Sequence, residues 1–188
     1  KNPRLAPITA PLANPNVPLY EPVNVSVIIP VGPGHERYVL DAIDSVNSQT
    51  YLGWSCIVID DTGGKIEWLP PFVKLLTTGK VGAGPAVARN IGIKASTTPL
   101  FIPLDADDYL QSDALELLVA AWNEHGGYVY SDWIKQESKE VYSTAEYNCT
   151  TILSQLHHAV TAIYPRVAWK DCGGFDESLK AWEDWDFV

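Results

Sequence analysis

Three carboxylates are crowded into one short stretch, Asp105-Ala106-Asp107-Asp108, directly after the apolar run 100–104. Two carboxylates about 4 Å apart repel each other by roughly 1 kcal/mol in water and about 4 kcal/mol at an effective dielectric constant of 20. A divalent cation would turn this repulsion into binding energy, and an all-oxygen ligand set suits Mg²⁺, Mn²⁺ or Ca²⁺ better than Zn²⁺. An acidic turn that caps the next helix would look the same, so this stretch alone leaves both interpretations open.

Two further acidic pairs stand out along the chain. Asp60-Asp61 ends the apolar run 55–59, and Glu183-Asp184 lies close to the last residue of the sequence. Turn aspartates and acidic first turns of helices are common explanations for such pairs, because carboxylates accept hydrogen bonds from backbone donors and favour helix N-termini. A carboxylate placed beside a hydroxyl can instead act as a general base.

Short apolar and β-branched segments supply the elements that must position these carboxylates. Runs of this kind bounded by turn residues predict a buried strand over residues 25–30 and further strands over 55–59, 72–76 and 100–104. Apolar residues at helical spacing predict helices over residues 35–49, 84–95 and 112–122. Strand and helix in alternation indicate an α/β fold with a mostly parallel central sheet flanked by helices.

The C-terminal part of the chain is less regular. Strands are predicted over 128–132 and 159–164, a short helix over 166–171, and 138–154 has no decisive pattern. Ser112 is the expected N-cap of the helix that follows it, because a hydroxyl there can accept a hydrogen bond from a free backbone N–H.

The expected sheet brings the acidic groups to one rim. In open parallel sheets, ligands bind beyond the carboxyl ends of the strands, where loops converge and helix N-termini add positive potential. Asp60-Asp61 and Asp105 follow two such strand ends, and Arg89 lies in the helix after a glycine-rich turn. This composition is poorly suited to a free anion, but it suits a metal-bound diphosphate with a nucleobase beside it.

Composition and charge limit the class of protein. With 188 residues, 46% hydrophobic content and a net charge of −10, one acidic globular domain is expected. The negative charge argues against nonspecific binding to nucleic acid or to anionic membranes. Six prolines in the first 22 residues favour an extended tail or linker over 1–23, which leaves 24–188 for the folded domain.

Cysteines and apolar runs indicate the compartment. Cys56, Cys149 and Cys172 are odd in number and widely spaced, so neither a disulfide framework nor a zinc site is expected. No apolar run approaches the roughly 20 residues of a membrane-spanning helix. We therefore expect a cytoplasmic location, or one at the cytoplasmic face of a membrane with any membrane association made through regions outside this chain.

An ordered series of motifs resembles the inverting glycosyltransferases of family 2, whose nucleotide-sugar-binding fold is called GT-A. Asp105-Ala106-Asp107-Asp108 is similar to the family's D-x-D-D metal motif, and residues 88–92 to its A-R-N-x-G helix. The other matching segments are 26–30, 42–50, 59–62, 173–177 and 183–186. Seven matches in the same order make a GT-A domain the expected fold, continued beyond the last residue of this sequence.

The resemblance implies a donor site for a nucleotide-diphosphate sugar. Its expected donor-binding residues are Pro30, Asp60, Asp61, Arg89 and Asp105. The two neighbouring aspartates would bind the nucleobase, which in this family is usually uracil.

The resemblance also implies a metal and a catalytic base. Asp107, assisted by Asp105, would hold the divalent cation, Mn²⁺ or Mg²⁺, that bridges the diphosphate. Asp184 would accept the proton of a hydroxyl acceptor as that oxygen attacks the anomeric carbon. Displacement from the opposite face inverts the configuration, so Asp184 must lie across the sugar from the metal.

Residues near this base are candidates for the acceptor side of the site, namely His158, Asp176, Trp182, Glu183 and Trp185. The two tryptophans could stack against a sugar, although core and interface positions are more common for this residue. A satisfied, partly buried histidine explains His158 equally well. The acceptor itself, a glycan, a lipid-linked molecule or another hydroxyl compound, is not specified by these residues.

Two other classes of protein remain as alternatives. One is a noncatalytic nucleotide-sugar-binding or assembly module of a larger protein, suggested by the proline-rich segment. The other is a nucleotidyltransferase, which normally carries a basic glycine-rich loop after its first strand. Gly32-Pro33-Gly34-His35 lacks that basic pattern, so the nucleotidyltransferase is the least favoured.

Overall fold

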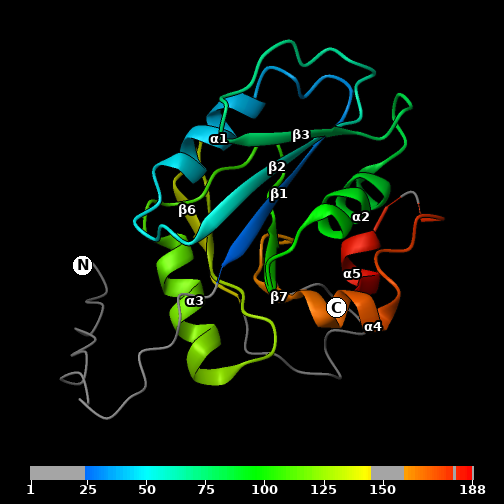
Figure 1. The fold of residues 1–188 in the computed structure, drawn as a ribbon. Helices are drawn as coiled ribbons and strands as arrows, with labels where there is room; N and C mark the ends of the chain where they lie inside the picture. Colours follow the sequence, from blue (N-terminus) through cyan, green and yellow to red (C-terminus); the bar gives the residue numbers. More distant parts are fainter. Residues whose placement is uncertain (1–23, 145–158, 180, 188) are drawn as a thin grey trace.

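Figure 1 shows a central sheet with helices on both of its faces. The computed structural model describes residues 24–144, 159–179 and 181–187. Five strands pair in the order β3-β2-β1-β4-β7. They are β1 Val25–Val31, β2 Trp54–Asp60, β3 Val73–Thr77, β4 Leu100–Pro103 and β7 Tyr164–Pro165. The first four pair in parallel and β7 joins β4 antiparallel, so the predicted mostly parallel α/β sheet is confirmed.

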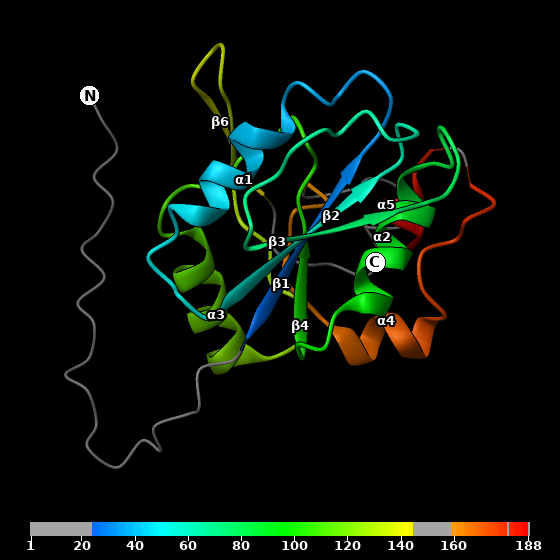
Figure 2. The ribbon, with the colours of Figure 1, turned by 45° about the horizontal axis from the view of Figure 1, so that its top comes forward.

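Helices cover the sheet on two sides. They are α1 Val39–Asn47, α2 Pro85–Ala95, α3 Ala114–His125, α4 Arg166–Cys172 and α5 Glu183–Phe187. α1 and α3 lie on one side of the sheet, whereas α2, α4 and α5 lie on the other (Figures 1 and 2). The first helix begins later than predicted, at Val39, because the glycines and proline of residues 32–34 place the preceding segment in turns.

Alternation of side chains along β1 divides the core into two layers. Val27 and Ile29 are fully buried on the side of α1 and α3, where Ile43 belongs to the same cluster. Ile28 points the other way and packs in a second cluster with Ile93 of α2. A central parallel strand is buried on both faces, which explains why β1 is apolar at nearly every position.

The start of α3 is stabilised from another element. Ser112 is not its cap, since the helix begins after Asp113 and no side-chain cap bond is made there. Instead, Gln49 Oε1 accepts a hydrogen bond from the Leu115 N–H at 2.9 Å, and Gln49 Nε2 donates to the Gln111 carbonyl at 2.7 Å. The expected local cap is therefore replaced by a long-range contact from Gln49, which follows the end of α1.

The C-terminal strands differ from the prediction. Instead of a strand over 128–132, only Val129 forms an isolated antiparallel bridge, with Ile163. Of the strand expected over 159–164, only Tyr164 lies in a strand, the two-residue β7, and Ile163 forms the isolated bridge. Both segments contain apolar residues because they pack at the end of the sheet, not because they form long ladders.

A hairpin that was not predicted follows, and only its second strand lies in the range 138–154 that had no decisive pattern. Its strands are β5 Trp133–Lys135 and β6 Glu140–Tyr142, and all of their residues are exposed. Trp133 and Tyr142 stack with ring centroids 4.1 Å apart. An aromatic cross-strand pair of this kind stabilises a hairpin without the buried face on which strand prediction depends.

None of the helices in the described part of the chain combines the length and the apolar character needed to cross a membrane. Cys56 is buried and Cys172 is exposed, both as free thiols, and Cys149 lies outside the described residues. Burial raises the pKa of the Cys56 thiol to about 12, so this side chain stays neutral.

We predict that Gly92 is required for the close approach of α2 to the sheet. A Cβ atom there would lie 2.6 Å from Ile28 Cγ2 and 2.7 Å from Ile59 Cδ1. Gly92→Ala should lower the free energy of unfolding by about 1–3 kcal/mol, because it overpacks a dense core. Urea denaturation measures this loss. Gly32→Ala, whose new methyl group meets nothing within 4 Å, is the matched control, and equal stability of the two variants would contradict the prediction.

Candidate functional site

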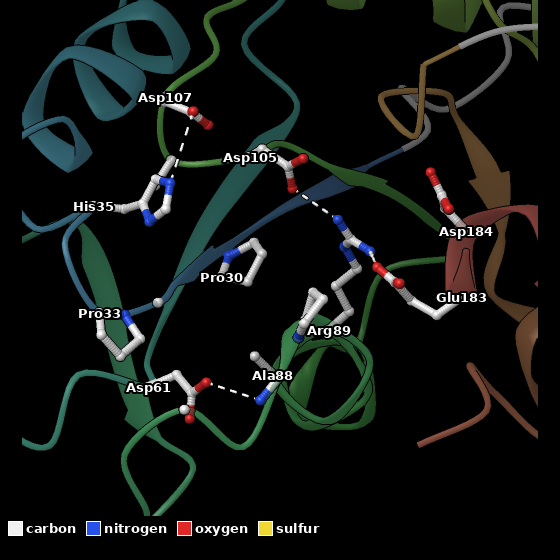
Figure 3. A pocket seen from close by; sticks show the side chains of 15 residues that line it. Pro30, Pro33, His35, Asp61, Ala88, Arg89, Asp105, Asp107, Glu183 and Asp184 are labelled. Atoms are coloured by element: carbon white, nitrogen blue, oxygen red, sulfur yellow. Dashed lines mark hydrogen bonds and ion pairs between the residues drawn. The ribbon is translucent and has the colours of Figure 1, made fainter. Parts of the chain in front are cut away.

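A cavity of about 470 Å³ opens beyond the carboxyl ends of β1, β2 and β4. Figure 3 shows side chains from several elements converging on it. Its lining consists of Pro30, Gly32, Pro33, His35, Asp61, Gly82, Gly84, Pro85, Ala88, Arg89, Asp105, Ala106, Asp107, Glu183 and Asp184. This is the rim at which parallel sheets bind their ligands.

Asp61, just after β2, is fixed by three hydrogen bonds. Its Oδ1 accepts from the Thr78 hydroxyl at 2.6 Å and from the Ala83 N–H at 2.8 Å, and its Oδ2 accepts from the Gly84 N–H at 2.9 Å. Gly84 has a φ of 109°, a conformation that glycine adopts without strain. An ionised carboxylate has about four acceptor positions, so Asp61 retains capacity for a nucleobase N–H.

Asp60 has a different environment from its neighbour. Its Oδ1 accepts hydrogen bonds from the Thr62 N–H at 2.7 Å and the Thr62 hydroxyl, and its Oδ2 accepts from the Gly64 N–H at 2.9 Å. Asp60 does not line the cavity. Its carboxylate organises the loop that follows β2.

The three aspartates after β4 also have distinct surroundings. Asp105 and Asp107 line the cavity, whereas Asp108 does not. Partial burial, together with the negative charges of Asp105 and Asp107, raises the pKa of Asp108 to about 6. The crowding therefore has an electrostatic cost that a bound cation would relieve.

Arg89 is almost completely buried, with 4% of its side chain exposed. Its Nη1 donates to Glu183 Oε1 at 2.5 Å, and its Nη2 donates to Asp105 Oδ1 at 2.8 Å. Burial by itself would lower the pKa of the guanidinium, but the charges and hydrogen bonds of Asp105 and Glu183 outweigh it and raise the pKa. Arg89 is thus a charged bridge between the loop after β4 and the start of α5.

Asn90, the next residue of α2, holds the segment that follows α4. Its Oδ1 accepts hydrogen bonds from Trp169 Nε1 and the Phe175 N–H, both at 2.9 Å. Its Nδ2 donates to the Phe175 carbonyl at 2.9 Å and to Glu177 Oε1 at 3.0 Å. A Cβ atom on Gly174 would lie 2.9 Å from Asn90 Oδ1, so the glycine permits this close contact.

Asp184 lies at the start of α5, half-buried at the cavity wall. Its Oδ1 accepts a hydrogen bond from the Trp185 N–H at 3.0 Å. Figure 3 shows Asp184 and Asp107 on opposite sides of Asp105, with Glu183 turned toward Arg89. Carboxylates from distant parts of the sequence therefore converge on one cavity.

Most of the predicted site residues meet at this cavity. Those that line it are Pro30, Asp61, Arg89, Asp105, Asp107, Glu183 and Asp184. Their roles as donor ligands, metal ligands and base remain predictions.

Asp176, Trp182 and Trp185 do not line the cavity. Asp176 is exposed, and hydrogen bonds from the Ser178 hydroxyl and backbone N–H lower the pKa of its carboxyl. Trp182 is 67% exposed and lies edge-on to Trp185 with ring centroids 5.9 Å apart. His158 lies outside the described residues.

His35, which sequence reasoning misses, also lines the cavity. It extends from the loop after β1, and its Nε2 lies 3.8 Å from Asp107 Oδ2. A histidine five residues beyond Pro30, at the carboxyl end of a predicted strand, was the available signal.

The donor atoms at the mouth of the cavity fit a divalent cation. Among the described residues, none donates a hydrogen bond to the Asp107 carboxylate, and only Oδ1 of Asp105 is engaged, by Arg89. No three His, Cys, Asp or Glu side chains in the described ranges are grouped so as to hold a metal ion by themselves. A cation bound here would complete its shell with diphosphate oxygens and water, as Mg²⁺ does at many phosphate sites.

Comparison with known sequences identifies the family. The family model described as "Glycosyl transferase family 2" matches residues 26–159. An uncharacterised glycosyltransferase of Rickettsia typhi is 30% identical over 185 residues, which cover 89% of this chain and 58% of the relative. The chain therefore belongs to glycosyltransferase family 2, and it spans little more than half the length of this relative.

Solved structures share the fold. Residues 1–349 of Staphylococcus aureus TarS in complex with UDP-GlcNAc superpose with a TM-score of 0.69 at 23% identity, over 87% of this chain and 52% of that fragment. The mannosyltransferase PcManGT of Pyrobaculum calidifontis, in complex with GDP-Man and Mn²⁺, superposes with a TM-score of 0.67 at 18% identity, over 95% of this chain and 54% of that protein. These likenesses confirm the predicted GT-A fold.

The buried bridge predicts strongly coupled stability effects. Arg89→Met should lower the free energy of unfolding by about 3–5 kcal/mol, because Glu183 would remain buried without its partner. Adding Glu183→Leu removes that unpaired carboxylate and should recover most of the loss. A double-mutant cycle in urea measures the coupling, which should exceed about 1 kcal/mol.

The control for this cycle is Arg37→Met. Arg37 is exposed and donates a hydrogen bond to the Tyr38 hydroxyl. Its replacement should change stability by about 0.5 kcal/mol or less, as for most surface substitutions. Additive effects of the Arg89 and Glu183 substitutions would show that the bridge does not hold the two elements together.

Proposed function

We propose that this domain transfers a sugar from a nucleotide-diphosphate donor, with UDP as the expected nucleotide, to a hydroxyl acceptor with inversion at the anomeric carbon. One observation carries the proposal. A single cavity unites Asp61, the pair Asp105 and Asp107, and Asp184, although these residues come from three separate parts of the chain. Together they supply the groups needed for base recognition, metal binding and proton removal.

The donor class has support from the structural neighbours. TarS has been solved with UDP-GlcNAc, and PcManGT with GDP-Man and Mn²⁺. Both ligands are sugars activated by a nucleoside diphosphate. The fold of this chain is the same, so a donor of this class is the simplest ligand for its cavity.

In the proposed complex, Asp61 accepts a hydrogen bond from the nucleobase and Pro30 contributes to the donor site. Asp107 and the free oxygen of Asp105 hold the divalent cation, Mn²⁺ or Mg²⁺. When bound, that ion offsets the negative charge that gathers on the leaving nucleoside diphosphate. Arg89 acts indirectly in this scheme, because both of its Nη atoms are bonded to carboxylates.

Asp184 is the proposed general base. The acceptor oxygen forms a bond to the anomeric carbon while the bond from that carbon to the diphosphate oxygen breaks. The hydroxyl proton moves to the Asp184 carboxylate, and the electron pair of the broken bond leaves with the diphosphate. The position of Asp184 across Asp105 from Asp107 is consistent with attack from the face opposite the leaving group.

A noncatalytic module is the second candidate function. It draws on the observation that the chain covers 58% of its Rickettsia typhi relative, so that residues needed for turnover could lie elsewhere. This candidate predicts metal-dependent nucleotide binding without transfer or donor hydrolysis. An assay of transfer and donor hydrolysis in a longer chain, as long as the relative, separates the enzyme from the noncatalytic module.

A cytoplasmic location remains a proposal for either function.

For Asp184→Asn, we expect unchanged binding of UDP with Mn²⁺ and a loss of about 10²–10⁴-fold in turnover, because a general base contributes a factor of this size. Donor hydrolysis and transfer report turnover, and calorimetry reports binding. Asp186→Asn is the matched control, because Asp186 is exposed on the same helix and does not line the cavity. Full activity of Asp184→Asn would exclude Asp184 as the base.

For Asp107→Asn, we expect the loss of metal-dependent nucleotide binding. UDP with Mn²⁺ should raise the melting temperature of the unmodified protein, since ligand that binds only the folded state stabilises it by mass action. The variant should show little of this shift, whereas Asp171→Asn, an exposed aspartate on α4, should keep it. A full shift in the Asp107 variant would remove this residue from the metal site.

A further inference from the structure

We propose that His35 ligates the divalent cation of the donor site together with Asp107, so that the protein supplies one nitrogen and one or more oxygen ligands. This inference rests on the cation site of the proposed function. It adds a ligand that neither the D-x-D-D motif nor the comparisons assign.

The first support is the distance between the two side chains. His35 Nε2 and Asp107 Oδ2 are 3.8 Å apart, too far for a hydrogen bond. Two ligands of an octahedral ion with bonds of about 2.1 Å are separated by about 3.0 Å when adjacent and about 4.2 Å when opposite. The observed separation lies between these limits, so one ion can bridge both atoms after a small side-chain rotation.

The second support is the freedom of both groups to make that rotation. The side chains of His35 and Asp107 are 48% and 51% exposed, and both line the cavity (Figure 3). Asp107 is the one described residue that faces the His35 imidazole at ion-pair distance. Asp105 is less available, because Arg89 holds its Oδ1.

Hydrogen bonds in the loop after β1 fix the backbone position of His35. The His35 N–H donates to the Gly32 carbonyl at 3.1 Å, and the Tyr38 N–H donates to the His35 carbonyl at 3.0 Å. Gly34, with a φ of 90°, makes the turn from Gly32 to His35 possible. The histidine backbone is therefore anchored on both sides while its ring reaches over the cavity.

A nitrogen ligand has a consequence for metal choice. Mn²⁺ and Mg²⁺ both bind carboxylate and water oxygens, but Mn²⁺ is a transition metal and accepts an imidazole nitrogen more readily than the harder Mg²⁺. The site should therefore favour Mn²⁺ over Mg²⁺ in the presence of the nucleotide. An imidazole that merely donated a hydrogen bond to a phosphate would give no such preference.

Pulsed electron paramagnetic resonance of Mn²⁺ bound with UDP to the whole chain tests the proposal, because it detects nitrogen nuclei coordinated to the ion. We expect nitrogen coupling in the unmodified protein, its conversion to the ¹⁵N pattern on ¹⁵N-histidine labelling, and its loss in His35→Ala. His125→Ala is the control, because His125 is exposed at the end of α3 and does not line the cavity. The nitrogen coupling should persist in this variant. The labelling arm uses the unmodified chain and so does not depend on how a variant folds.

Calorimetry with each metal and UDP gives a second readout. His35→Ala should weaken Mn²⁺ binding on the order of tenfold and Mg²⁺ binding much less, because only the former gains from imidazole. Mn²⁺ binding without nitrogen coupling, or coupling that survives in His35→Ala, would overturn the inference and leave the proposed function intact. If UDP promoted no Mn²⁺ binding at all, both the inference and the proposed cation site would fail.

Discussion

The buried guanidinium of Arg89 is the interaction on which the arrangement of the site depends. An unpaired charge with 4% exposure would be very costly, so the fold must bring carboxylates to it. Asp105 comes from the loop after β4 and Glu183 from the start of α5. Because both must meet the same planar cation, the proposed metal ligands after β4 and the proposed base next to Glu183 have little freedom to move apart.

Helix α2 transmits this constraint through three neighbouring positions. Gly92 lets the helix lie against Ile28 and Ile59 of the sheet, Arg89 fixes the two carboxylates, and Asn90 holds the backbone at Phe175. The same helix begins at the turn whose N–H groups fix Asp61. Side chains that converge on the cavity are thus held in position by contacts with one helix, α2. Such support from a rigid element is what a preorganised site requires.

Patterns in the sequence predicted those parts of the structure that local physics determines. The apolar runs of β1, β2 and β4 are largely buried, and β3 is a half-exposed edge strand that keeps its apolar residues, so composition and turn residues were enough to find all four. The exposed hairpin of β5 and β6 has no buried face, and Gln49 caps α3 across 66 residues, so neither is visible locally. Ordered motifs indicated Asp61, Asp107 and Asp184, but the pairing of Arg89 with Glu183 needs the folded chain.

The clasp made by Asn90 has a consequence for how such domains diversify. The Asn90 side-chain amide bonds to the backbone N–H and carbonyl of Phe175. These two hydrogen bonds fix the path of the backbone there and do not depend on the side chain at position 175. The segment after Phe175 can therefore vary in composition, provided that the chain keeps a glycine at 174 for the contact with Asn90 and a carboxylate at 183 for the pair with Arg89. Replacement of the segment beyond Phe175 would then leave β4 and the loop that carries Asp105 and Asp107 in place.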